Sequence, residues 1–160
     1  MRNSQFLEKI ISGGQTGADR AGLDFALAHA IPHGGWCPKG RLAEDGTISQ
    51  GYKLEETPTA YPDQRTEWNV RDSDGTAIFS VAADLNGGSK LTAVLAQKQG
   101  KPCLHISAGD SSSPEDALVR FVQRNKIRVL NIAGPRASEE PAVDKFVRRT
   151  LEKAFENCPD

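Results

Sequence analysis

The 160-residue sequence has few cysteines and no excess of charge of either sign. Its three cysteines are scattered and odd in number, which is typical of reduced thiols in the cytoplasm rather than of a disulfide framework. Lys and Arg total 20 against 21 Asp and Glu, which leaves a formal net charge of −1. Proteins that bind duplex nucleic acid usually present a strongly basic face. The composition therefore predicts a cytoplasmic protein with no nucleic-acid partner.

Long hydrophobic runs are also missing. The longest, residues 77–83, contains Ser80 and is far shorter than the ~18 apolar residues of a membrane-spanning helix. The first residues lead directly into the charged pair Glu8 and Lys9, so no signal peptide is expected. These absences argue against the membrane and secreted classes, and the length predicts a single domain over residues 1–160.

Short apolar runs alternate with segments of helical period, as in a parallel sheet with crossover helices. The predicted strands are residues 9–12, 33–37, 77–81, 102–107 and 128–133. The predicted helices are residues 18–30, 65–73, 89–100, one that begins at Ser113 and Pro114, and 138–155. In helix 89–100, we expect Leu91, Val94 and Leu95 to face the core. The pattern predicts an α/β fold, a Rossmann-like three-layer sandwich with a parallel sheet of about five strands.

Residues 38–62 have no clear period and are rich in Pro, Gly, Asp and Glu. A loop of this length in a compact domain is usually functional. Gly40, Gly46 and Gly51 are candidate hinges, which would suit a lid.

A glycine turn, residues 12–19 (SGGQTGAD), joins the first predicted strand to the first helix. Free N–H groups and the helix dipole favour an anion at such a turn, and Gly13 and Gly14 let a ligand approach the backbone closely. The turn departs from the dinucleotide fingerprint, because Ser12 stands where the first glycine belongs. The alternative that needs no ligand is a capping box formed by Thr16 and Asp19.

A second glycine turn, residues 86–90 (NGGSK), follows the third strand. Both turns are expected to face one crevice, where open α/β sheets bind their ligands. Residues 133–136 (AGPR) form either a third wall of this crevice or a plain strand-to-helix turn.

Cations, not an acid, follow the second strand. NAD would need an acid there for its ribose hydroxyls, whereas Lys39 and Arg41 suit an oxyanion. A zinc site at His29, His33 and Cys37 is disfavoured, because Pro32 breaks any common helical face and a fourth ligand is missing.

The polar segment at residues 65–72 (RTEWNVRD) has two interpretations. Either Arg65, Thr66 and Asn69 share a helical face that points into the crevice, or the helix is solvated and Trp68 docks in the core.

Six motifs together carry a resemblance to a known family. They are residues 12–20 (SGGQTGADR), 32–40 (PHGGWCPKG), 44–46 (EDG), 65–74 (RTEWNVRDSD), 87–89 (GGS) and 131–136 (NIAGPR). With them the sequence resembles the molybdenum cofactor carrier family, in the larger group of Rossmann-like proteins that includes the cytokinin-activating phosphoribohydrolases. The resemblance implies a Rossmann-like fold, a homodimer or homotetramer, and molybdopterin bearing molybdenum as the carried small-molecule anion.

Molybdopterin suits the candidate site, by this resemblance. Its phosphate would bind the N–H groups of residues 13–17 or 87–89, and a molybdate-like oxo group would bind Lys39, Arg41 or Arg65. Its pterin edge would contact amides such as Asn69 or Asn86, with Trp36 or Trp68 against the ring; which end lies at which turn stays open. Cys37 is a less suitable molybdenum ligand. The candidate binding residues are Gly13, Gly14, Gln15, Thr16, Gly17, Lys39, Arg65, Asn69, Gly87, Gly88 and Ser89, with no catalytic or metal-ligating residue.

The enzymes of the larger group carry a catalytic Glu in the helical turn after their glycine turn. Here residues 90–94 (KLTAV) contain no carboxylate, which favours binding over catalysis. Two alternatives stay open: a phosphoribohydrolase-like enzyme that uses Asp19 or Glu67 on nucleoside monophosphates, and a nucleotide-sensing module.

Overall fold

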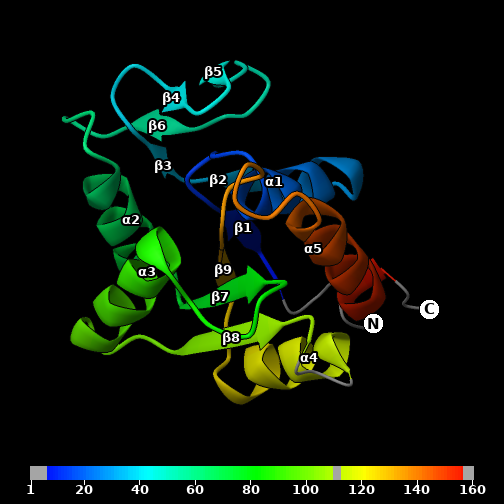
Figure 1. Ribbon diagram of the computed structural model, residues 1–160. Coiled ribbons are helices and arrows are strands. Elements are labelled where there is room, and N and C mark those ends of the chain that lie inside the picture. The colour runs from blue at the N-terminus through cyan, green and yellow to red at the C-terminus, as the bar shows by residue number, and fades with distance from the viewer. Residues whose placement is uncertain (1–6, 110–112, 157–160) are drawn as a thin grey trace.

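The computed structural model describes residues 7–109 and 113–156, and within these ranges five strands form one sheet (Figure 1). They are β1 (Lys9–Ile11), β2 (His33–Gly34), β7 (Gly75–Ser80), β8 (Cys103–Ser107) and β9 (Val129–Ala133). The strand order is β2-β1-β9-β7-β8, and every neighbouring pair is parallel. The predicted Rossmann-like α/β sandwich is confirmed.

Helices cover both faces of the sheet. On one face lie α1 (Ala18–Ala28), α4 (Pro114–Arg124) and α5 (Val143–Leu151), which the π-helical segment η2 (Glu152–Glu156) prolongs. On the other face lie α2 (Pro62–Arg71) and α3 (Gly87–Lys98), which pack side by side (Figure 1). Helix α5 begins five residues later than predicted, because residues 134–142 form turns. No helix in the described ranges has the length and apolar character needed to cross a membrane.

The strand order matches a known topology when counting begins at the last strand, β9. With β9, β1, β2, β7 and β8 taken as strands 1 to 5, the order reads 3-2-1-4-5, that of the Rossmann fold. The helices that follow the adjacent strands β9 and β7 lie on opposite faces of the sheet. Ligands of open α/β sheets bind at such a reversal, beyond the carboxyl ends of the strands. The topology therefore places the expected ligand site at the ends of β9 and β7.

The two faces of the sheet differ in polarity. Side chains alternate along a strand, so Leu130 and Ile132 of β9 join the hydrophobic core beneath α1, α4 and α5. Asn131, between them, projects to the opposite face, where it meets Thr76 of β7 in register. Both polar side chains are buried. The core thus lies on the side of α1, and a polar floor lies on the side of α3.

This polar floor explains an incorrect prediction for α3. The helix buries Ser89, Thr92 and Ala96 against the sheet, whereas Val94 is 41% exposed. The sequence pattern predicts instead that Val94 faces the core together with two leucines. Because the surface below α3 is polar, the small side chains of the helix face it.

The predicted strand at residues 33–37 is divided at Gly35. The φ of Gly35 is +126°, and a Cβ there would collide with the carbonyl oxygen of Ser12. β2 therefore stays in the main sheet, and β3 (Trp36–Cys37) leaves it to pair with β6 (Glu55–Glu56). These strands begin an outer lobe, residues 36–61, which also holds the hairpin of β4 (Leu42–Ala43) and β5 (Gly46–Thr47).

Residues 38–62, which the sequence predicts to be a functional loop, contain the short strands β4, β5 and β6, and Arg41 organises them. The guanidinium of buried Arg41 donates to the carbonyl oxygens of Ile48, Ser49, Tyr52 and Leu54. With these acceptors satisfied inside the lobe, Arg41 is a structural residue. The expectation that it binds a ligand oxyanion is corrected.

Among the cysteines, Cys37 is buried and Cys103 exposed, and both are free thiols. Cys158 lies outside the described residues.

Candidate functional site

A crevice opens at the carboxyl ends of β1, β9 and β7. Its deep section, defined as the part that reaches strand residues 131–133, has a volume of about 70 Å³. Its outer section, defined as the part that reaches the exposed residues Asp63 and Arg136, has a volume of about 150 Å³. Five residues line both sections: Asp19, Arg65, Thr66, Gly88 and Gly134. The two glycine turns and the connection after β9 therefore meet at one place, as the strand order requires.

The amides of the first glycine turn have acceptors within the protein. Gly14 N–H donates to Ser12 Oγ (3.4 Å), and Gln15 N–H donates to the Asp19 carboxylate (3.3 Å). Thr16 N–H donates to the Oε1 of Gln15 (3.0 Å). The turn does hold an anion, as its N–H groups predict, but this anion is the protein's own carboxylate.

The capping box of Thr16 and Asp19, the alternative interpretation of this turn, is not formed. The residue before the helix is Gly17, and no side chain caps it. Asp19 reaches back to Gln15, and the Thr16 hydroxyl contacts Glu44 of the outer lobe and accepts the N–H of Ala137 (3.1 Å). Thr16 therefore joins three segments together.

Asp19 is the titratable group at the centre of the crevice. It is only 7% exposed, and burial raises its pKa from 3.8 to about 6. Arg65, the amide of Gln15, Arg20 and the amide of Gly13 all lower this pKa, but by less than burial raises it. Asp19 is therefore ionised at neutral pH, at a cost in free energy.

Arg65 lies flat against the first turn. Its Nη1 donates to the carbonyl oxygen of Gly13 (3.1 Å), and its Nε donates to Thr66 Oγ1 (3.3 Å). A Cβ on Gly13 would stand 2.7 Å from that Nη1, so the close approach requires glycine. Arg65, Thr66 and Asn69 all line the deep crevice, which places the polar face of α2 on the side of the site.

Asn69 lines the crevice but uses its amide to hold the fold. Its Oδ1 accepts the backbone N–H of Trp36 and its Nδ2 donates to the carbonyl oxygen of Trp36, both at 2.9 Å. The indole of Trp36 donates to Asp72 and packs edge-on against Trp68 at 4.7 Å. These three side chains fasten α2 to β3. Asn69 alone of the three lines the crevice, and its bonds to Trp36 fix the orientation of its amide there.

Gly14 and Gly17 make room for protein and not for a ligand. Their φ values are +81° and +85°. A Cβ on Gly14 would stand 2.6 Å from Leu54 of the outer lobe, and one on Gly17 would stand 2.5 Å from the carbonyl oxygen of Pro135. Of the first turn, Gly13 lines the deep section of the crevice and Gln15 the outer section.

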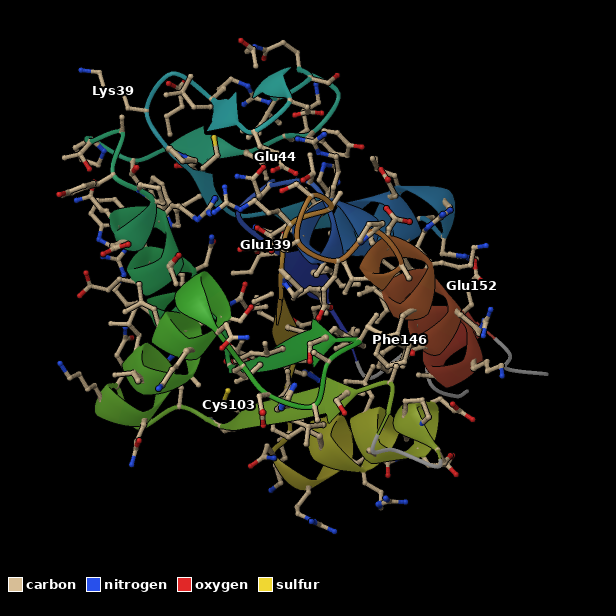
Figure 2. The ribbon with its side chains drawn as sticks, viewed as in Figure 1. Lys39, Glu44, Cys103, Glu139, Phe146 and Glu152 are labelled. Carbon is tan, nitrogen blue, oxygen red and sulfur yellow. The ribbon has the colours of Figure 1, made fainter. Side chains whose placement is uncertain are left out.

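The structure separates Lys39 from the crevice. Lys39 is exposed on the outer lobe, where Figure 2 shows it pointing away from the molecule. Among the described lining residues, the cations are Arg65 and Arg136, and Arg136 is paired with Glu139 at 3.7 Å. Lys39 follows a strand that has left the main sheet, so the end of that strand no longer faces the site.

The second glycine turn is open. Gly87 and Gly88 are the first residues of α3, so their N–H groups have no acceptor within the helix. A Cβ on either would meet nothing within 4 Å. Gly88 lines both sections of the crevice and Ser89 lines the outer section, whereas Asn86 lines a separate cavity with Ser80 and Glu140. Free amides for an anion are thus found at α3.

The crevice includes residues outside the predicted binding set, among them Asn131, Thr92 and Gly134, and Gly134 belongs to the segment 133–136 that was expected as a third wall. Asn131 and Thr92 form the floor, and Gly134 passes between the end of β7 and Ala18 of α1. A Cβ on Gly134 would collide with the carbonyl oxygen of Phe79. The sequence signal was present, because Asn131 is a polar residue within the otherwise apolar run 129–133.

Comparisons with known proteins cover almost the whole chain. The family model described as the circularly permutated YpsA SLOG family matches residues 10–155. The crystal structure of a "putative molybdenum carrier protein" from Syntrophus aciditrophicus is 50% identical, covers 96% of this chain and 97% of that chain, and superposes with a TM-score of 0.90. No curated protein matches the chain. The permutation in the family description agrees with a Rossmann order that starts at β9.

Proposed function

The chain belongs to the circularly permutated YpsA SLOG family, and from that premise we propose that it is a non-catalytic carrier of the molybdenum cofactor or a related phosphorylated pterin. The ligand binds in the crevice at the ends of β1, β9 and β7. The similar protein from Syntrophus aciditrophicus is named for carrying molybdenum. The chemistry of the crevice supports an organic phosphate as the carried group.

One observation carries the proposal: free amides and a fixed guanidinium line the same crevice. Gly88, at the N-terminus of α3, and Arg65, on α2, line both of its sections. The amides and the positive end of the helix dipole stabilise a phosphate monoester, and Arg65 adds a charge-assisted hydrogen bond. Molybdopterin bears such a phosphate.

Recognition is assigned to the organic portion of the ligand. Within residues 7–109 and 113–156, no three His, Cys, Asp or Glu side chains are grouped so that they would hold a metal ion. Cys37, a soft thiol ligand in principle, is fully buried, and burial raises the pKa of its thiol. Molybdenum would travel within the cargo, and the chain's own groups would hold the pterin and its phosphate.

The second candidate function is hydrolysis of the bond between base and ribose in a nucleoside monophosphate, which releases the free base. It is favoured by Asp19, because a carboxyl group with a pKa of about 6 in a crevice suits acid–base chemistry. Glu67, the other candidate acid, is exposed and lines neither section of the crevice. Asp19 is also the acceptor of the first glycine turn, which accounts for its burial without catalysis.

Reconstitution separates the two functions. The purified protein is incubated with molybdenum cofactor released from a molybdoenzyme and is then desalted. We expect molybdenum by elemental analysis and oxidised pterin by fluorescence, each near one per chain, and no adenine from a parallel incubation with AMP. Release of adenine would support the hydrolase function. A protein that retains neither molybdenum nor pterin would overturn the carrier function.

A further inference from the structure

The deep end of the crevice combines two buried hydrogen-bond acceptors with one donor. We infer that this end binds the 2-amino-4-oxo edge of a pterin, through Asp19, Asn131 and Arg65, and that the ligand's phosphate points outward to the N-terminus of α3. This inference rests on the proposed function and adds the orientation of the ligand.

The first acceptor is Asn131 on the floor. It is 3% exposed, and its Nδ2 donates to Thr76 Oγ1 at 3.1 Å. The described residues provide no hydrogen-bond partner for its Oδ1, although the residue lines the cavity. A buried acceptor without a partner is costly, so such a group in a native protein calls for a ligand or water.

The second acceptor is Asp19. One of its oxygens accepts the N–H of Gln15, and the residue lines both sections of the crevice. An ionised carboxylate has about four lone-pair sites and no donor, so bonds to the turn leave capacity towards the cavity. Neighbouring donors on a ligand would use that capacity and would offset some of the cost of burying the charge.

The donor is Arg65, whose position is held by its bond to the carbonyl oxygen of Gly13. Arg65 lines both sections of the crevice, so one guanidinium can donate to the pterin edge in the deep section and to the phosphate in the outer section. Two acceptors and one donor complement a heterocycle edge with an N–H, an amino group and a carbonyl oxygen. The 2-amino-4-oxo pyrimidine ring of a pterin has this edge.

The deep end adds the buried amide of Asn131 to the carboxylate of Asp19, and this pair complements a heterocycle edge better than a phosphate. The outer section adds the donors Gln15, Ser89 and Arg136, beside the carboxylates of Asp19, Asp63 and Glu139. The added donors of the outer section favour the phosphate there, which gives the ligand one direction in the crevice.

The test compares pterin with lumazine, which has a 2-oxo group in place of the 2-amino group. Binding of each is measured by fluorescence titration at pH 7.5. We expect at least tenfold tighter binding of pterin, because the 2-oxo group of lumazine would face the Asp19 carboxylate. Asn131 adapts by rotating its amide, so the preference depends mainly on Asp19. Equal affinities in the wild-type protein would overturn the inference, whatever the variants do.

Two variants test whether Asp19 is responsible for the preference for pterin over lumazine. Asp19→Asn should reduce the pterin-to-lumazine ratio to near one. Asp24→Asn is the matched control, because Asp24 is on the same helix, accepts the hydroxyl of Tyr52 at 2.6 Å and does not line the crevice. Asp24→Asn should keep the full ratio, and an equal loss in both variants would contradict the assignment.

Inorganic phosphate tests the direction of the ligand. Phosphate and pterin should bind together without competition if the phosphate site is at α3, whereas mutual displacement would overturn the inferred orientation. Retention of molybdenum cofactor in the reconstitution, with no preference for pterin over lumazine, would refute this inference alone. Failure of that reconstitution would refute the carrier function as well.

Discussion

The first glycine turn, residues 12–19, and the second, residues 86–90, both join a parallel strand to a helix, but their surroundings differ. The first is filled from within by Asp19 and covered from outside by the outer lobe. The second has open space at Gly87 and Gly88. A glycine turn thus provides an anion site only where the rest of the fold leaves its amides free.

The covering of the first turn is built from polar contacts. The Glu44 carboxylate accepts the Thr16 hydroxyl and the hydroxyl of Ser138 (2.6 Å), and Arg20 pairs with Asp45 at 2.6 Å. Figure 2 shows Glu44 on the outer lobe above the β9–α5 connection. These contacts fasten the outer lobe to α1 and to that connection. Any opening of the lobe as a lid would have to break them.

The sharpest way to test the contrast is one substitution made in each turn. Gly14→Ala should destabilise the protein by roughly 2–4 kcal/mol, because its φ is positive and its Cβ would meet Leu54 and Ile48. Gly88→Ala should change the stability by less than about 1 kcal/mol, since alanine suits a helix and the space is open. Urea unfolding measures both. Equal losses would mean that the two turns are packed alike.

Removal of Arg65 tests the side of the crevice that faces α3. Arg65→Ala should weaken binding of the molybdenum cofactor by about 1.5–3 kcal/mol, the value of a charge-assisted hydrogen bond. Binding is measured by titration, and the control is the same titration of Lys39→Ala, because Lys39 lies on the outer lobe away from the crevice. An effect of Lys39→Ala as large as that of Arg65→Ala would show that the anion binds elsewhere.

The buried carboxylate of the first turn should make stability depend on pH. The pKa of Asp19 is raised from 3.8 to about 6, so its protonation stabilises the fold below pH 3.8, and that stability is lost as the pH rises through 6. Above pH 7, Asp19→Asn should therefore be more stable than the wild type by about 1–3 kcal/mol. Urea unfolding at pH 4 and pH 8 measures this. If the stability advantage of Asp19→Asn over the wild type does not increase from pH 4 to pH 8, the raised pKa of Asp19 is contradicted.

The smallest effect is expected from Glu44→Gln. Hydrogen bonds from Ser138 and Thr16 lower the pKa of Glu44, so its contribution is present above pH 4.5 and is lost as the pH falls. The substitution should speed hydrogen exchange in residues 42–47 and leave residues 87–89 unchanged. Faster exchange in both segments would show that the outer lobe and the second turn open together.

Several predictions that depended only on patterns among neighbouring residues are confirmed, although the capping box of Thr16 and Asp19 is not. The parallel α/β sandwich and the family resemblance are examples. The all-buried strand β7 is another, since an apolar run predicts a strand covered on both faces. Errors arose where a distant segment changed the outcome, as at Gly35, Val94 and Arg41. Gly35 lies against the carbonyl oxygen of Ser12, and Arg41 is bound by the outer lobe's own carbonyl oxygens. Val94 is turned to the exposed side of α3, because the small side chains of the helix face the polar floor of the sheet.

Alternating apolar residues, glycine turns and helix signals act over a few neighbouring residues, and they were sufficient for the class of fold and for both turns. The amides of the first turn are taken by side chains one to four residues away, those of Ser12, Gln15 and Asp19. The cover over this turn comes from contacts over long separations: 52 residues between Gly13 and Arg65, and 28 between Thr16 and Glu44. No local pattern records such contacts. Whether an amide binds a ligand or the protein's own oxygen depends on which side chain reaches it after the chain has folded.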